Sequence, residues 1–135
     1  MDDVSKLTLL GSQQTEYKLS GPSAEMLESF PNPRIGRDYI IEHKTDEFTS
    51  LCPKTGQPDY AKITVRYTPD KTCVETKSLK LYWFAYRNEG SFMETIVNRM
   101  LDDLILAIQP EWMRIVGKFK SRGGIHTTVE VEHQK

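Results

Sequence analysis

The pattern of apolar and polar side chains predicts four β-strands. In the clearest one, residues 61–68, Ile63, Val65 and Tyr67 lie on one face, and charged or hydroxyl side chains lie on the other. The last strand alternates as regularly. The four predicted strands are residues 37–48, 61–68, 112–121 and 125–132.

Two segments between the second and third strands have the periodicity of helices. In the longer one, residues 92–109, an apolar residue recurs at every fourth position, and Pro110 follows its end. This stripe consists of Phe92, Ile96, Met100, Leu104 and Ile108. The shorter helix is expected at residues 77–87. Its inward side chains are expected to be Leu81, Phe84 and Ala85.

The order strand, strand, helix, helix, strand, strand predicts an α+β fold. An antiparallel four-stranded sheet with both helices on one face satisfies this order. We expect residues 37–135 to form this domain and residues 1–36, which glycine and proline interrupt, to form an N-terminal arm with a helical turn capped by Ser23. Such a sheet has two exposed edges, and copies that close into a ring would pair them. The pattern therefore predicts a homo-oligomer.

Charge and composition argue against several classes of protein. The 135 residues include 18 basic and 19 acidic side chains, and a net charge of −1 argues against binding nucleic acid by bulk electrostatics. No apolar run approaches the roughly 20 residues of a membrane span, and the acidic start at Met1 lacks the features of a secretory signal. We therefore expect a cytoplasmic protein. The three histidines are scattered and no CxxC spacing occurs, so no metal site is predicted.

The segment from Cys52 to Asp59 carries the strongest candidate chemistry. A turn rich in glycine and proline joins the cysteine to the aspartate. A thiolate is an effective nucleophile, and a carboxyl group beside it can give and take protons. The alternatives are a small buried side chain for Cys52 and a turn-bracing role for Asp59.

Three basic side chains could hold phosphate groups. Lys77 and Lys80 are three residues apart, so on a helix they share a face near its N-terminus. Arg122 precedes two glycines, whose backbone can approach a ligand closely. In isolation, a solvated helix face and a hairpin turn are the simpler interpretations.

Glu94 has two interpretations that the sequence leaves open. Ser91 and Glu94 have the S-x-x-E spacing of a capping box at the start of the long helix. Alternatively, the Glu94 carboxylate could accept two N–H groups from a guanine-like ring, each in a charge-assisted hydrogen bond. The local sequence favours the cap.

Taken together, these motifs resemble one family. In order, they are FTSLCPKTGQPD at residues 48–59, VETKSLKLY at 74–82, RN at 87–88, FME at 92–94, GKF at 117–119 and RGGI at 122–125. The ordered set is similar to that of the single-module NADPH-dependent 7-cyano-7-deazaguanine reductases of queuosine biosynthesis, a tRNA-modification pathway. The resemblance implies the tunnelling fold (T-fold), in which subunits close into pentameric rings that stack as a decamer.

The resemblance also implies a reaction and its residues. The nitrile of 7-cyano-7-deazaguanine would be reduced by NADPH to 7-aminomethyl-7-deazaguanine. Cys52 would attack the nitrile carbon to form a covalent thioimide, and Asp59 would move protons. The implied substrate-binding residues are Val74, Glu75, Thr76, Met93 and Glu94. The implied cofactor-binding residues are Lys77, Lys80 and Arg122. No direct nucleic-acid or membrane partner is implied.

One position departs from the family pattern. The family usually has histidine immediately before the anchoring glutamate, whereas this chain has Met93, which cannot donate a strong hydrogen bond or move a proton. We expect Asp59 to carry the proton transfers alone and Met93 to pack against the substrate.

Three other functions are alternatives to the reductase. An archaeosine-type amidinotransferase acts on the same nitrile, but it lacks the Glu-x-Lys-Ser-x-Lys motif that this chain has. The absence of a histidine set disfavours a zinc-dependent T-fold enzyme. The third is a purine-binding module that has lost activity, against which the intact Cys52 and Asp59 argue.

Overall fold

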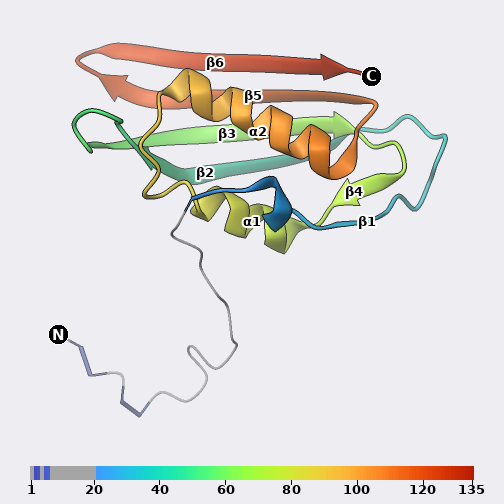
Figure 1. Ribbon diagram of the computed structural model, residues 1–135, viewed down its shortest axis with the longest axis horizontal. Coiled ribbons are helices and arrows are strands. Elements are labelled where there is room, and N and C mark those ends of the chain that lie inside the picture. Colours follow the sequence, from blue (N-terminus) through green and yellow to red (C-terminus); the bar gives the residue numbers. More distant parts are fainter. Residues whose placement is uncertain (1, 4, 7–20) are drawn as a thin grey trace.

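A computed structural model describes residues 2–3, 5–6 and 21–135 of the chain (Figure 1). The main sheet has four antiparallel strands in the order β2-β3-β5-β6. They are β2 (Ile41–Leu51), β3 (Pro58–Thr68), β5 (Trp112–Arg122) and β6 (Ile125–Gln134). Helices α1 (Thr76–Phe84) and α2 (Met93–Ile108) lie on the same side of this sheet (Figure 1). The predicted α+β fold with two helices on one face is confirmed.

Residues 21–36, which belong to the predicted arm, pack against the domain. Ser23 caps the short 3-10 helix η1 (Ala24–Met26), since its hydroxyl accepts a backbone N–H as predicted. Leu27 is only 8% exposed and joins the main core. Two short strands in addition to the four predicted ones form a separate antiparallel pair, β1 (Ser29–Pro31) and β4 (Thr72–Val74). Residues 1, 4 and 7–20 of the predicted arm lie outside the described residues.

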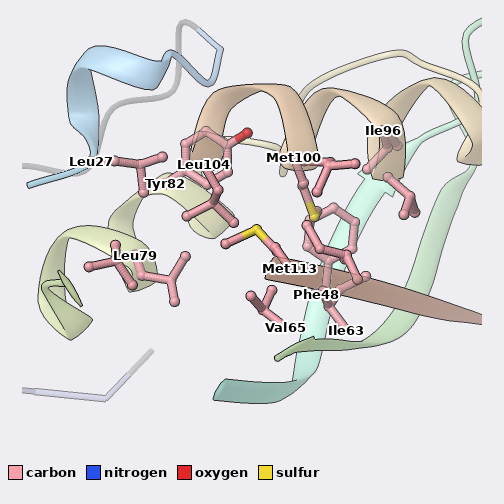
Figure 2. Packing of buried hydrophobic residues seen from close by; sticks show 14 of the residues in the cluster. Leu27, Phe48, Ile63, Val65, Leu79, Tyr82, Ile96, Met100, Leu104 and Met113 are labelled. Carbon is pink, nitrogen blue, oxygen red and sulfur yellow. The ribbon is translucent and has the colours of Figure 1, made fainter. Parts of the chain in front are cut away.

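One hydrophobic core fills the space between the sheet and the helices (Figure 2). Strand β3 contributes Ile63, Val65 and Tyr67, which are fully buried, as their alternation predicts. Helix α2 contributes Ile96, Val97, Met100, Leu101, Leu104 and Ile108. Strand β5 approaches this helix closely at Gly117, where an added Cβ would lie 2.8 Å from a methyl carbon of Val97.

The predicted faces of both helices are wrong in part. Phe92 precedes α2 as its N-cap and is 65% exposed, so it does not belong to the buried stripe. In α1 the buried side chains are those of Ser78, Leu79 and Tyr82, whereas Leu81 and Phe84 are only partly buried. Residues 79–84 are mostly apolar, so the periodicity of this short helix fits more than one inward face.

Candidate active site

Strands β2 and β3 bring Cys52 and Asp59 to one end of the sheet. Ser50 and Asp59 are directly opposite partners in the antiparallel ladder, so their side chains lie on the same face. Cys52 follows Ser50 by two residues, and its N–H still donates across the hairpin to the Gln57 carbonyl at 2.8 Å. The charge of Arg122 acts on the Cys52 thiol, and Arg122 also contacts the Asp59 carboxyl group, so both groups lie at the same end of the sheet.

A tight turn surrounds Cys52 with hydrogen-bond donors. The N–H of Gly56 donates to the Cys52 carbonyl at 3.0 Å, and Gly56 has a φ of 72°, a conformation that favours glycine. The hydroxyl of Thr55 and the N–H groups of Thr55 and Lys54 stabilise the thiolate and lower the pKa of Cys52 from 9.0 to about 7. The positive charge of Arg122 also lowers the pKa of Cys52, whereas burial raises it. A large fraction of Cys52 is therefore thiolate at neutral pH.

Arg122, at the end of β5, holds the Asp59 side chain. Its Nε lies 2.5 Å from Oδ1 of Asp59, whose side chain is only 7% exposed. A terminal nitrogen of the same guanidinium donates to the Gln57 carbonyl at 3.2 Å. A buried carboxylate needs a partner of opposite charge, and Arg122 supplies it.

The loop before α2 lies along the other side of β2. The N–H of Leu51 donates to the Glu89 carbonyl at 3.0 Å, and the N–H of Ser91 donates to the Leu51 carbonyl at 3.1 Å. These bonds form a parallel bridge between Leu51 and Gly90. The backbones are close, because a Cβ on Gly90 would lie 3.4 Å from Cα of Pro53. The Cys52 turn and the start of α2 are therefore neighbours.

Met93 and Glu94 open α2 beside this turn. Met93 is partly buried against the core, and the exposed Glu94 lies in the first turn. The predicted capping box is wrong, because Phe92 is the N-cap and no side chain caps this helix. The backbone N–H of Ser91, which Glu94 would accept in a capping box, donates instead to the Leu51 carbonyl. Capping therefore does not account for Glu94.

The segment that opens α1 carries the other predicted substrate residues. Val74 is buried, and Thr76 is exposed. Glu75 caps the helix, because its carboxylate accepts the N–H groups of Lys77 at 2.7 Å and Ser78 at 2.8 Å. These two bonds lower the pKa of Glu75. The N–H groups expected to help bind a phosphate are thus already bonded to a carboxylate.

A groove of about 590 Å³ runs between α1 and the outer edge of β2. Thr76, Lys80 and Arg87 bring hydroxyl, ammonium and guanidinium groups to it, which are groups that bind phosphate. Trp83 adds an aromatic ring. The side of the groove that carries these donors suits phosphate groups, whereas Glu42 and Glu47, which also line the groove, do not. Sequence reasoning missed Trp83 and Arg87, although both follow Lys80 at helical spacing.

The predicted site residues fall into two groups, which lie at opposite ends of the folded domain within a single subunit (Figure 1). The first group gathers where β2 ends and α2 begins, and consists of Cys52, Asp59, Met93, Glu94 and Arg122. The second gathers where β4 ends and on the first half of α1, and consists of Val74, Glu75, Thr76, Lys77 and Lys80. The nine residues of α1, about 1.5 Å each along the axis, lie between the groups. A single chain therefore does not bring the predicted set together.

Two further features of the described residues bear on the site. They include no group of three or more His, Cys, Asp or Glu side chains that could hold a metal ion. None of their helices combines the length and apolar character needed to cross a membrane.

Known proteins resemble this chain over most of its length. A family described as "QueF-like protein" matches residues 58–135. A protein of Nitrosomonas eutropha named NADPH-dependent 7-cyano-7-deazaguanine reductase is 54% identical over 112 residues, which cover 83% of this chain and 81% of that protein. One of the same name from Nitratidesulfovibrio vulgaris is 51% identical over 134 residues, covering 99% of this chain and 81% of that protein.

The chain belongs to the QueF-like family. The family predicted from the motifs is therefore confirmed. A solved structure titled as the archaeosine synthase QueF-Like in the apo form has a TM-score of 0.65 at 22% identity. The match covers 69% of this chain and 91% of the chain in that structure. This likeness shows the shared fold alone.

The Thr55 hydroxyl is a site group that sequence reasoning missed, although threonine hydroxyls in turns often bond nearby groups. Thr55→Val removes the largest contribution to the low pKa of Cys52. We expect the midpoint of Cys52 alkylation against pH to rise from about 7 by about one unit, and alkylation at pH 7 to slow accordingly. The measurement is the rate of iodoacetamide labelling of Cys52 by peptide mass spectrometry.

Thr55→Ser is the matched control, because it keeps the hydroxyl and should keep the wild-type midpoint. Cys73, which is 2% exposed, serves as a slow internal reference. Equal midpoints for Thr55→Val and wild type would contradict the assigned cause.

Proposed function

We propose that this chain reduces the nitrile of 7-cyano-7-deazaguanine with NADPH, giving 7-aminomethyl-7-deazaguanine for queuosine biosynthesis. The observation that carries the proposal is the hairpin that holds Cys52, with its pKa of about 7, beside the buried carboxyl group of Asp59. Relatives more than half identical carry the name of this activity. The substrate is a free base, so the reaction needs no nucleic-acid partner. The proposal includes a cytoplasmic location, which is consistent with a role in tRNA modification.

Cys52 performs the first step. Its sulfur bonds to the nitrile carbon, one π bond of the C≡N group breaks, and the nitrogen takes up a proton, which gives a thioimide. Asp59 exchanges protons with this nitrogen, because its carboxyl group lies at the same end of the β2–β3 hairpin as the Cys52 turn. Arg122 stabilises the carboxylate that remains when a proton has left.

NADPH supplies hydride when bound. Reduction of a nitrile to an amine takes four electrons, so two NADPH and two further protons are consumed per substrate. After the first reduction, the C–S bond breaks, Cys52 leaves as a thiolate and an imine remains for the second reduction. The low pKa of Cys52 favours this departure. Asp59 therefore supplies one proton to the nitrogen when the thioimide forms and one when the imine is reduced, which accounts for the two protons consumed.

Glu94 anchors the deazaguanine ring in this proposal. Its carboxylate is exposed beside the Cys52 turn and does not cap α2. Two ring N–H groups can donate to its two oxygens. Met93, the residue before Glu94, packs partly against the core, and its apolar side chain would also pack against the ring. The protons then come from Asp59 alone.

The groove beside α1 is the proposed cofactor site. Lys80 and Arg87 would hold the phosphates of NADPH, and Trp83 offers a surface on which a ring can stack. Lys77, at the start of the same helix, extends the positive charge along it. Arg122 lies beside Asp59, at the end of the domain away from this groove. Its predicted contact with the cofactor therefore requires a second subunit.

A homo-oligomer would complete the site. Strands β2 and β6 are the edges of the described sheet, and pairing them between copies would satisfy their backbone groups. We propose that the α1 end of one copy meets the Cys52 end of its neighbour, so that Glu75 and Thr76 reach the substrate there. The family implies pentameric rings that stack as a decamer.

The direct test is NADPH oxidation in the presence of 7-cyano-7-deazaguanine. We expect two NADPH per amine formed and no turnover by Cys52→Ala, because the nucleophile is lost. The substrate-free enzyme is the control. Wild-type protein that binds the base but oxidises no NADPH would contradict the reductase and favour the amidinotransferase or a binding module.

A mixing experiment tests the shared site. Two variants are used, Cys52→Ala and the double variant Lys77→Ala/Lys80→Ala, which alter the two ends of the domain separately. Each should be inactive as a pure oligomer. Unfolding and refolding them together at equal amounts should restore about a quarter of the wild-type activity, because about a quarter of the interfaces then join two intact halves.

Refolded wild type sets the full scale for this mixing experiment, and each variant refolded alone sets the baseline. No recovery from an oligomer that has mixed would mean that each site is built within one chain.

A further inference from the structure

Ser50 carries a hydroxyl that the fold does not use. The side chain is fully buried in β2, and its Oγ has no hydrogen-bond partner among the described residues. Buried hydroxyl groups are nearly always bonded, because leaving one unpaired costs the hydration that it had in water. An unpaired Ser50 hydroxyl therefore requires an explanation, since alanine would fill the same space without this cost.

The position of Ser50 points to the site. It is the direct cross-strand partner of Asp59, and it precedes by two residues Cys52, which follows the end of β2. On its other side along β2 lies Phe48, which is 2% exposed and belongs to the hydrophobic core. Ser50 thus lies at the boundary between the core and the two groups that carry the proposed chemistry.

The Asp59 carboxyl group can accept this hydroxyl. Directly opposite residues in an antiparallel pair have Cβ atoms about 4.5–5.5 Å apart, so rotation about one side-chain bond of Ser50 brings its Oγ within reach. Arg122 occupies Oδ1 of Asp59, and a carboxylate has further acceptor positions. The Cys52 sulfur is the other nearby acceptor, but it is a weaker one.

We infer that Ser50 is a positioning residue for the proposed nitrile reduction. Its hydroxyl hydrogen-bonds the Asp59 carboxyl group during turnover and fixes the direction from which that group exchanges protons with the substrate nitrogen. This inference rests on the proposed function, in which Asp59 is the proton-transfer group.

Ser50→Ala tests the inference, because a structural and a positioning role predict opposite patterns. We expect kcat for NADPH oxidation to fall about tenfold, with the KM for 7-cyano-7-deazaguanine unchanged within twofold. The melting temperature should stay the same or rise, because the variant removes an unpaired buried hydroxyl.

Ser78→Ala is the matched control for stability. Ser78 is also buried, but its hydroxyl donates to the Glu75 carbonyl at 2.8 Å and accepts the N–H of Glu28 at 3.0 Å. Its melting temperature should fall. Ser50→Ala with wild-type kcat, or with kcat and melting temperature lowered together, would overturn the inference.

A double-mutant cycle separates Asp59 from Cys52 as the acceptor. In single turnover, the rate of thioimide formation is measured by intact mass for Ser50→Ala, Asp59→Asn and the pair. If Ser50 acts through Asp59, Ser50→Ala costs less than twofold in the Asp59→Asn background. Losses that multiply would overturn the inference. A wild type that forms no thioimide would instead refute the proposed function.

Discussion

The backbone pairing at Leu51 is the constraint on which the site depends. On one side this residue faces Pro58, which has no N–H to offer, in the β2–β3 register. On the other side its N–H and carbonyl both bond to the loop that leads into α2. One strand residue therefore fixes the Cys52 turn against the start of the helix that carries Glu94. A slip of one residue in this register would turn the Asp59 side chain to the opposite face of the sheet.

Two acidic groups can lie close together at this end of the sheet because each has its own stabilising partners. The thiolate of Cys52 takes the hydroxyl and amide donors of its own turn, whereas the Asp59 carboxylate takes the guanidinium of Arg122. The division suits a reaction in which sulfur attacks and leaves as a thiolate while a carboxyl group repeatedly exchanges protons.

Local sequence patterns predicted the sheet, both main helices and the Cys52–Asp59 pair, because these follow from periodicity and short-range spacing. The first strand was placed early, at 37–48, since the bulge between Thr45 and Phe48 breaks its alternation. The predicted capping box is absent because the helix begins one residue later, with Phe92 as N-cap, and the Ser91 N–H bonds to β2 over a long range in sequence. The site residues are divided between two ends of the domain because of the strand directions and the topology. The spacing of the motifs along the sequence gives no information about either.

The most direct test of the central claim, that Cys52 is the nucleophile, is the intact mass of the protein after incubation with 7-cyano-7-deazaguanine without NADPH. We predict a mass increase of one substrate molecule per chain, mapped to Cys52 by peptide analysis and absent from Cys52→Ala. A wild-type mass that stays unchanged at saturating substrate, or an adduct that persists in Cys52→Ala, would contradict the claim.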